Sequence, residues 1–428
     1  MPIKLKYHDQ TIEVPDPPVG EILTLKGNPV NPLADPRASL LKTLDHPINS
    51  APLKEMIPSD GPITVMVSDR TRKTRLDIIL PVLMNYISKN GIPNEKIRIL
   101  VCLGTHKRHT AEQLEKLIGT KLLRRYKVIE SHQEDQRAFI EVGKTPRGTP
   151  VRFNRNALES GLLIPIGNIT FHYFAGFSGG RKSFLPGISC EETIQTNHKL
   201  TYMKQNGEFV RNPMCASRVL DGNPLNEDME DAFRLIPVPS FLVNTVLNPE
   251  GDIAGIFTGN VIDAHRAGCD EFTRHYSLPI TKKADIVIAS AGGYPADINL
   301  LQSHKSMVNA SEALKPGGTL FLTARCIEGV NLEDYPEFIA THTRQELIEK
   351  LMQGYRILGG TTDNLMGRAE KFRIFLVSGL ESSTLTNLGV KPFDMEHPNW
   401  DEVFKSLDGN STCYVMPNAS KYLPVMNL

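Results

Sequence analysis

Ile63-Thr-Val-Met-Val-Ser-Asp69 is a short, mainly apolar run of the kind that forms a buried strand. Residues 76–89 follow as a predicted helix, and Ile97-Arg-Ile-Leu-Val-Cys-Leu-Gly104 is a second run of strand length. Two parallel strands need a crossover between them, which is usually a helix. The stretch 63–104 therefore predicts a βαβ unit and a parallel sheet.

Similar patterns continue on both sides of this stretch. We expect a hairpin within 3–14, a proline-rich loop over 15–36, a helix that Thr110 caps and Gly119 ends, and a strand over 161–169. A separate βαβ pattern begins with a strand at Ala284. Its further expected elements are a helix over 302–314, a strand over 319–323, a helix over 345–352 and a strand over 372–378.

These patterns predict an α/β protein with two α/β domains, mainly parallel sheets and an active-site cleft between the domains. We expect residues 1–268, joined by the tail 412–428, to form the N-terminal domain, which carries most of the chemistry. Residues 278–411 are expected to form a C-terminal domain that closes over the ligand.

Composition narrows the class of protein. The chain has 428 residues, 40% hydrophobic and 22% charged, and its 48 Lys and Arg residues balance 48 Asp and Glu residues. This neutrality favours neither a nucleic-acid partner nor an anionic membrane. The six cysteines include no CxxC pair, and no stretch approaches the roughly 18 apolar residues of a membrane span. We expect a cytoplasmic protein in a reducing compartment.

Three predicted strand ends carry an unusual load of polar residues. They are Ser68-Asp-Arg-Thr-Arg-Lys-Thr-Arg75, Gly104-Thr-His-Lys-Arg108 and Thr170-Phe-His-Tyr-Phe-Ala-Gly-Phe-Ser-Gly-Gly-Arg-Lys182. Open α/β sheets bind ligands at the carboxyl ends of their strands, so we expect a cationic cleft with two histidines here. Arg72 or Arg75 could hold a carboxylate or phosphate in two-point fashion, with Asp69 orienting one of them. The plain alternative for the arginine run is a solvated turn or a loose phosphate or nucleic-acid patch.

His106 and His172 follow separate strands. Each could be an ordinary hydrogen-bonded histidine, but together they suit paired acid and base work, in which one removes a proton and the other supplies one. Gln302 and Lys305 lie three residues apart on a predicted helix of the second domain and would share one face.

The glycine-rich stretch Phe177-Ser-Gly-Gly-Arg-Lys-Ser-Phe-Leu-Pro-Gly187 permits close backbone approach to an anion, with added charge from Arg181 and Lys182. Its spacing is not that of a Walker P-loop, and Lys182 could instead be a cofactor-attachment amine. His198 alone is a weak metal signal. Without an HExxH motif or cysteine cluster, a metal here would need ligands from something other than the protein.

Taken together, these motifs resemble the nickel-dependent lactate racemase family over about residues 1–310. The motifs that carry the resemblance are Asp69-Arg-Thr-Arg72, Gly104-Thr-His106, His172-Tyr-Phe-Ala-Gly-Phe-Ser-Gly-Gly-Arg-Lys182, Asn197-His198 and Gly292-Gly-Tyr-Pro-Ala-Asp-Ile-Asn299.

The resemblance implies a cofactor, the nickel pincer nucleotide. This group is a pyridinium mononucleotide that binds nickel through thioacid groups and a ring carbon and forms a thioamide with a lysine. Lys182 would be its attachment point and His198 the protein ligand for nickel. We further infer that the backbone of Ser178, Gly179, Gly180 and Arg181, together with nearby basic groups, holds its phosphate. The implied partners are the proteins that make the cofactor and insert nickel.

The resemblance also implies an isomerase reaction, the racemisation or epimerisation of a 2-hydroxyacid. His106 and His172 would be the acid and base, and Arg72 would bind the substrate carboxylate beside Asp69. Gln302 and Lys305 match the family's polar pair from the second domain. The Cα hydride would move to the pyridinium ring, giving a transient 2-oxoacid, and would return to the opposite face.

The chain departs from the lactate enzyme where the substrate side chain should matter. Leu301 stands where that enzyme has an aromatic residue, and Trp400 is no obvious equivalent of its pocket tryptophan. A 2-hydroxyacid other than lactate is therefore expected, such as a longer or polyhydroxylated one. The alternatives are a non-catalytic carrier of the nickel cofactor and a nickel-free phosphate-ester or acyl-transfer enzyme.

Overall fold

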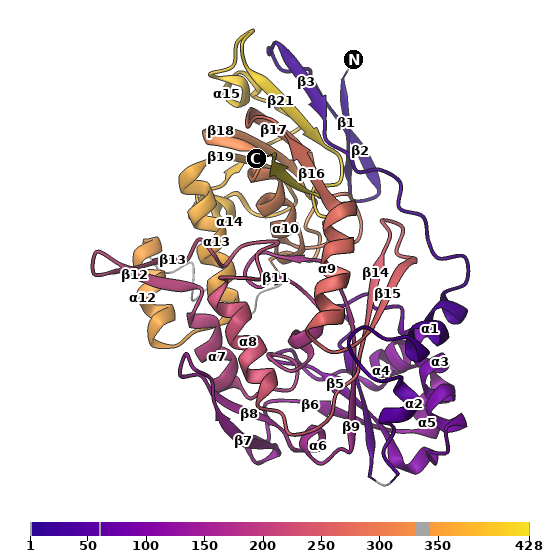
Figure 1. Cartoon of the computed structure of the whole chain (residues 1–428). Helices are drawn as coiled ribbons and strands as arrows, with labels where there is room; N and C mark the ends of the chain where they lie inside the picture. Colours follow the sequence, from indigo (N-terminus) through magenta and orange to yellow (C-terminus); the bar gives the residue numbers. More distant parts are fainter. Residues whose placement is uncertain (1, 60, 331–342, 428) are drawn as a thin grey trace. The chain divides into compact units, whose positions relative to one another are not determined.

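The computed structural model describes residues 2–59, 61–330 and 343–427, which form two compact units. The central unit is Val30–Arg274, and the terminal unit combines Met1–Pro29 with His275–Leu428. Each unit contains a mainly parallel sheet with helices packed on it, so the predicted fold class of two α/β domains is confirmed (Figure 1).

The sheet of the central unit has six strands among the described residues. In spatial order they are β15 (Ile253–Gly259), β14 (Leu242–Leu247), β9 (Leu162–Asn168), β4 (Ile63–Ser68), β5 (Ile97–Cys102) and β6 (Lys127–Ser131). All neighbours pair in parallel except β14 and β15. The predicted βαβ unit is confirmed, because β4, helix α3 (Leu76–Lys89) and β5 follow one another as expected.

The central unit also contains other helices. Their bounds are α1 (Pro36–Asp45), α2 (Leu53–Met56), α4 (Ala111–Ile118), α5 (Thr120–Arg125), α6 (Arg155–Leu158), α7 (Glu191–Lys199), α8 (Pro224–Arg234) and α9 (Asp263–Tyr276). The predicted cap of α4 is confirmed: Thr110 and Gln113 form a capping box, and Gly119 ends the helix. Buried residues of α3, among them Ile79, Leu83 and Ile87, pack into the core that includes Val65 of β4.

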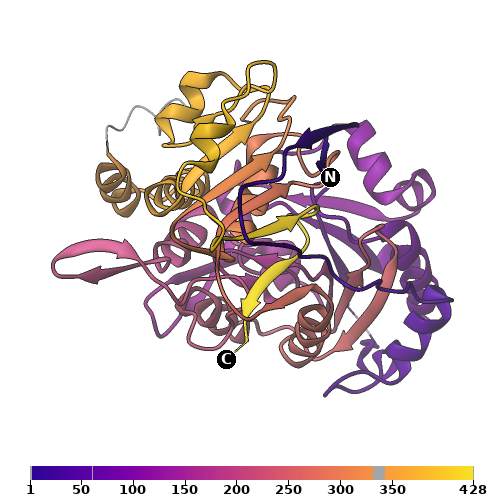
Figure 2. The same cartoon turned by 90° about the horizontal axis from the view of Figure 1, so that it is seen from above.

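Short elements connect these layers. They are the hairpins β7–β8 (Phe139–Lys144 and Pro150–Asn154), β10–β11 (Phe171–His172 and Gly176–Phe177) and β12–β13 (Tyr202–Gln205 and Glu208–Arg211), and the 3₁₀ turns η1 (Asn94–Lys96), η2 (Gln136–Ala138) and η3 (Gly180–Ser183). The β12–β13 hairpin projects away from its own unit in both cartoon views (Figures 1 and 2).

The sheet of the terminal unit also has six strands among the described residues. Their order is β20 (Lys391–Pro392), β19 (Arg373–Val377), β18 (Leu314–Thr323), β17 (Ala284–Ser290), β21 (Thr412–Met416) and β3 (Glu21–Thr24), with parallel pairing throughout. The other elements are β1 (Ile3–Tyr7), β2 (Gln10–Val14), β16 (Ser277–Ile280), β22 (Leu423–Met426), α10 (Leu300–Ser311), α12 (Arg344–Gln353), α13 (Ile357–Lys371), α14 (Ser382–Asn387) and α15 (Trp400–Phe404).

The structure divides the chain differently from the expected 1–268 with 412–428. Strand β21 lies between β17 and β3, and β22 pairs with β16, so the tail 412–428 belongs to the terminal unit. The first 29 residues belong there too. The physical reason is burial: Leu5 and Val14 of the β1–β2 hairpin share one apolar core with Ile286 of β17.

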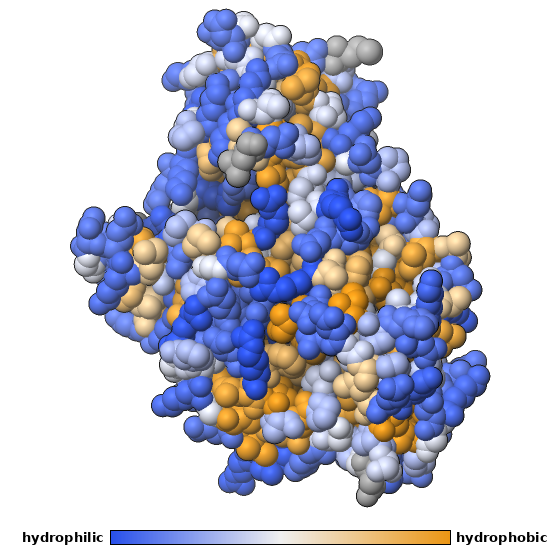
Figure 3. Space-filling model, in the orientation of Figure 1, coloured by the Kyte–Doolittle hydropathy of each residue, from blue (hydrophilic) through white to orange (hydrophobic). Residues whose placement is uncertain are grey.

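The surface carries mainly polar side chains. Figure 3 shows hydrophilic residues over much of the visible face, with smaller hydrophobic patches between them. Among the helices of the described residues, none has the length and apolar character needed to cross a bilayer. All six cysteines are buried free thiols.

Candidate active site

The topology of the central unit gathers three of the predicted motifs. Asp69 directly follows β4, His106 lies beyond the end of β5, and His172 lies just beyond β9. Strands β9, β4 and β5 are adjacent and parallel, so their carboxyl ends meet at one edge of the sheet.

Asp69 and His106 form a hydrogen-bonded pair. The distance from His106 Nδ1 to Asp69 Oδ2 is 2.9 Å, and the Asp69 side chain is 8% exposed. Burial opposes ionisation of this carboxyl, but the bond from His106 and the charges of His106 and Arg72 lower its pKa well below the ordinary value. A carboxylate that accepts from Nδ1–H leaves Nε2 as the proton-accepting nitrogen of a neutral His106 ring. Asp69 therefore orients the predicted base.

Asp69 also shapes the turn that carries Arg72. Its Oδ1 accepts the Thr71 amide at 2.7 Å, and its carbonyl accepts the Arg72 amide at 3.1 Å. Arg72 is exposed. Arg75, the other predicted anion binder, is instead engaged with Asp77 and Asp252, so the structure favours Arg72.

His172 faces the predicted attachment lysine. Its Nδ1 accepts the amides of Phe174 and Ala175, each at 3.3 Å, which places the proton of the neutral ring on Nε2. That Nε2 lies 3.3 Å from Lys182 Nζ. Burial and the charges of Arg181 and Arg72 lower the pKa of Lys182 well below its ordinary value, which favours a neutral amine that can accept the His172 proton.

His198 is buried on α7. Burial lowers the pKa of His198 to about 3. Its Nδ1 lies 2.9 Å from the Ile194 carbonyl one helical turn earlier. Because Nδ1–H donates to that carbonyl, the lone pair of the neutral ring is on Nε2, as metal ligation requires.

The loop that carries Lys182 is held from within by Arg181. The Arg181 side chain is 0% exposed, and its guanidinium donates to the carbonyls of Ala175, Phe177 and Gly179. The Arg181 charge therefore faces the loop's own backbone, and the expected binding of the cofactor phosphate by the Ser178–Arg181 backbone stays a prediction. Burial lowers the pKa of Arg181 to about 10.

Ser178 and the two glycines also have local roles. The Ser178 hydroxyl accepts the Thr170 amide at 2.8 Å and donates to the Asn168 carbonyl at 2.7 Å, so it closes the β10–β11 hairpin. Gly179 and Gly180 have φ values of 77° and 54°. A Cβ on Gly180 would lie 2.5 Å from the ring of His265, so both backbone conformation and packing require glycine.

Several buried side chains that support this loop were not predicted. His265 Nε2 lies 2.9 Å from the Ser178 carbonyl and 3.1 Å from Arg181, and Asn244 Oδ1 lies 3.4 Å from the Gly180 amide. Asp228 accepts from Asn197, the neighbour of His198, at 2.9 Å. A lone polar residue in a sequence carries no signal for such roles, because its partners are distant in the chain.

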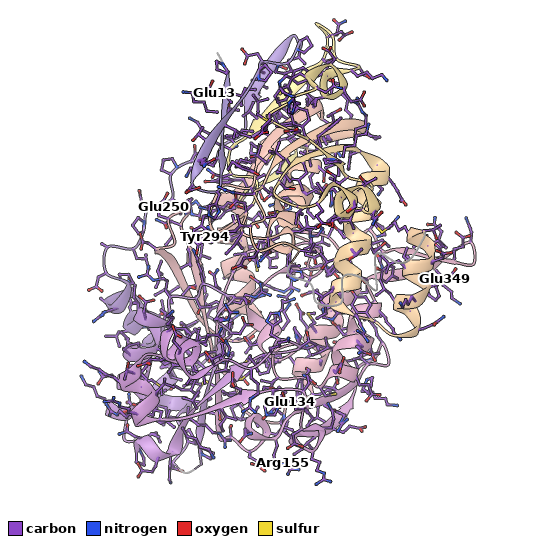
Figure 4. The ribbon with its side chains drawn as sticks, turned by 180° about the vertical axis from the view of Figure 1, so that it is seen from behind. Glu13, Glu134, Arg155, Glu250, Tyr294 and Glu349 are labelled. Atoms are coloured by element: carbon purple, nitrogen blue, oxygen red, sulfur yellow. The ribbon has the colours of Figure 1, made fainter. Side chains whose placement is uncertain are left out.

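Gln302 and Lys305 lie on α10 of the terminal unit. Lys305 Nζ donates to Gln302 Oε1 at 2.8 Å, so the predicted sharing of one helix face is confirmed. The Gly292–Asn299 loop before this helix is anchored by buried Asp297, whose Oδ2 accepts the His8 amide at 2.6 Å. Tyr294, labelled in Figure 4, is 61% exposed on that loop.

In comparison with known proteins, two stretches of the chain match domains of one family. Residues 7–209 match the lactate racemase N-terminal domain, and residues 280–362 match the lactate racemase C-terminal domain. A lactate racemase of Lactiplantibacillus plantarum is 36% identical over 67% of this chain and 66% of its own length. One of Thermoanaerobacterium thermosaccharolyticum is 31% identical over 79% of this chain and 78% of its own length.

A solved structure gives the same result at the level of the fold. The lactate racemase apoprotein of Thermoanaerobacterium thermosaccharolyticum superimposes with a TM-score of 0.88 and 26% identity, covering 99% of this chain and 100% of that one. The chain therefore belongs to the lactate racemase family.

Proposed function

We propose that this protein racemises or epimerises the C2 centre of a 2-hydroxyacid by proton-coupled hydride transfer. The observation that carries the proposal is the meeting of two independent pairs at one sheet edge: His106 with Asp69, and His172 with Lys182. The relatives named lactate racemase, which are isomerases, support the reaction class.

The side chains of the central unit fit the nickel pincer nucleotide. Lys182 would hold the group covalently, since its lowered pKa favours the neutral amine needed for a thioamide. His198 would be the nickel ligand through Nε2. Among the described residues there is no group of three or more His, Cys, Asp or Glu side chains that could hold a metal, so the nucleotide would supply the remaining ligands. When bound, this group would accept the Cα hydride and return it.

The two histidines would handle the hydroxyl proton. D and L substrates present their hydroxyl groups to opposite sides, so inversion needs one base on each side. His106 would act through Nε2, because Asp69 engages Nδ1. His172 would act through Nε2 as the proton donor of the pair, because backbone amides engage its Nδ1 and leave the ring proton on Nε2. Arg72 would hold the carboxylate in two-point fashion.

We propose a substrate other than lactate. Leu301 replaces the aromatic residue expected in the lactate enzyme, and the partly buried Trp400 packs against Phe321, Phe393 and Phe404 of the terminal unit. A smaller aliphatic side chain leaves room for a longer or polyhydroxylated acid. That Gln302 and Lys305 contact this substrate stays a prediction.

The test uses protein produced together with the cofactor-making and nickel-inserting proteins. A panel of 2-hydroxyacids of different side-chain length, each deuterated at Cα and including both lactate enantiomers, is incubated in ordinary water. We expect loss of optical purity with the Cα deuterium retained for at least one acid, because a hydride does not exchange with solvent. H106Q should abolish racemisation, and H397Q, at a site 85% exposed, should not.

Two results would contradict the proposal. A fully loaded protein that inverts no acid of the panel would favour a cofactor carrier. A chain whose intact mass shows unmodified Lys182 after maturation would favour a nickel-free enzyme.

A further inference from the structure

His109 and Glu130 form a buried pair beside the turn that carries Asp69 and Arg72. Their side chains are 2% and 7% exposed, and His109 Nδ1 lies 2.7 Å from Glu130 Oε1. The same oxygen accepts the His109 amide at 3.0 Å. Because Nδ1–H donates a hydrogen bond to the carboxylate, the neutral ring carries its lone pair on Nε2.

That lone pair points at the substrate-binding turn. The Arg70 amide donates to His109 Nε2 at 3.2 Å. Asp69 itself supplies the acceptors for the next two amides of the turn, those of Thr71 and Arg72. His109 therefore ties the backbone of this turn to a different loop, whereas the bonds that Asp69 makes to the Thr71 and Arg72 amides lie within the turn.

Two links then join the loop after β5 to the turn after β4. One is the bond between His106 and Asp69, and the other runs from His109, three residues later, to the Arg70 amide. A single link would leave the turn free to pivot about it. Two links fix its orientation, and with it the direction of the Arg72 side chain.

We propose that His109 and Glu130 are positioning residues: they hold the Asp69–Arg72 turn so that Arg72 meets the substrate carboxylate. Glu130 sets the tautomer of His109, and His109 accepts the Arg70 amide. The kinetic part of this inference rests on the proposed racemase function. The structural part concerns the turn alone.

Two substitutions test the hydrogen bonds of the two His109 nitrogens one at a time. In H109Q the side-chain oxygen can reach the position of Nε2 and accept the Arg70 amide. In H109N the side-chain nitrogen replaces Nδ1, so the bond to Glu130 is kept and the bond to Arg70 is lost. H109F keeps the shape and loses both. H132F is the matched control, because His132 is 24% exposed, two residues past Glu130, with Nδ1 3.6 Å from Glu134.

The first readout is amide hydrogen exchange at Arg70, followed by mass spectrometry with fragmentation. We expect H109N and H109F to speed this exchange about tenfold or more, the scale of one lost hydrogen bond, with H109Q and H132F close to the wild type. The second readout is steady-state kinetics of the loaded enzyme. KM should rise about tenfold in H109N and H109F with a smaller change in kcat, because Asp69 stays bound to His106.

Unchanged Arg70 exchange in H109N and H109F would overturn the proposal. So would faster exchange with wild-type KM in an active enzyme, since the pair would then stabilise the fold without serving the reaction. If the loaded wild type inverts no 2-hydroxyacid, the proposed function fails by itself, and the exchange measurement alone decides whether His109 holds the turn.

Discussion

Lys182 is an amine held in surroundings that oppose its charge. Its side chain is partly buried, and Arg181 and Arg72 add positive potential, so its pKa falls well below the ordinary value of 10.5. Near neutral pH, Lys182 is protonated in the unfolded chain, whereas the folded chain disfavours its protonated form. This difference lowers the free energy of unfolding. A nucleophilic amine is thus obtained at the expense of stability.

Replacing this amine should stabilise the unloaded protein. We expect K182M to raise the free energy of unfolding at pH 7 by about 1 kcal/mol, within the usual gain when an active-site strain is removed. Because the wild-type penalty disappears as the pH approaches the unfolded pKa, the advantage of K182M should shrink between pH 7 and pH 10.

Urea unfolding at several pH values measures this difference. K116M is the control, because Lys116 forms an exposed pair with Glu112 on α4 and its loss should change stability by less than about 0.5 kcal/mol. A K182M protein that is less stable than the wild type at pH 7 would show that the folded protein does not disfavour the protonated form of Lys182.

At the residue scale, the sequence could predict which side chains are reactive but not the hydrogen-bond partners that set their protonation. His106, His172, Lys182 and His198 were predicted from motifs. Their tautomers depend on acceptors and donors that only the fold supplies, such as Asp69 for His106, which is 37 residues distant. The His198 bond to Ile194 is the exception, because helical spacing brings residues four apart together.

At the scale of elements, the β10–β11 hairpin and η3 present Lys182 from a backbone that Arg181 clamps. A fully buried guanidinium with several backbone acceptors acts as an internal strut, and its removal leaves those carbonyls unpaired. Lysine has one donor group in place of the planar fork and cannot reproduce this pattern.

We therefore expect R181K to lower the free energy of unfolding by about 2–4 kcal/mol, a range typical of a broken buried polar network. The displaced loop should also slow cofactor attachment, seen as a smaller modified fraction of Lys182 by intact mass. R155K, at a site 53% exposed, serves as the control. Wild-type stability and loading in R181K would contradict the strut role.

The elements that the sequence predicted well are those with strong periodicity and caps. Helix α3 is buried at helical spacing, strands β4 and β5 are buried along almost their whole length, and α4 has both its cap and its glycine stop. Helix α13 was not predicted, because glycines 359, 360 and 367 weaken its signal. Strand β3 is a four-residue edge strand within the proline-rich stretch, where a loop was expected.

At the scale of the whole molecule, the residues expected to have different roles lie in different units. The central unit is one continuous segment and contains every side chain expected to bind the cofactor or move a proton. The terminal unit contains Gln302 and Lys305 and is assembled from both ends of the chain. No local pattern could predict that assembly, because β3 pairs with β21, nearly the whole chain length away.

This division predicts how fragments behave. Residues 30–274 contain all six strands of their sheet, so this fragment should fold alone and unfold cooperatively on heating. Residues 275–428 alone lack Leu5 and Val14, which cover Ile286 and Phe321 in one apolar core, and should aggregate. Fusing residues 1–29 to residues 275–428 through a flexible linker should restore a soluble fold. Circular dichroism and light scattering distinguish these states.

The contrary outcome is equal stability of residues 275–428 with and without residues 1–29. It would mean that the β1–β2 hairpin and β3 contribute nothing to the stability of the terminal unit. Burial of the hairpin's apolar face would then not be the reason why the first 29 residues belong to that unit.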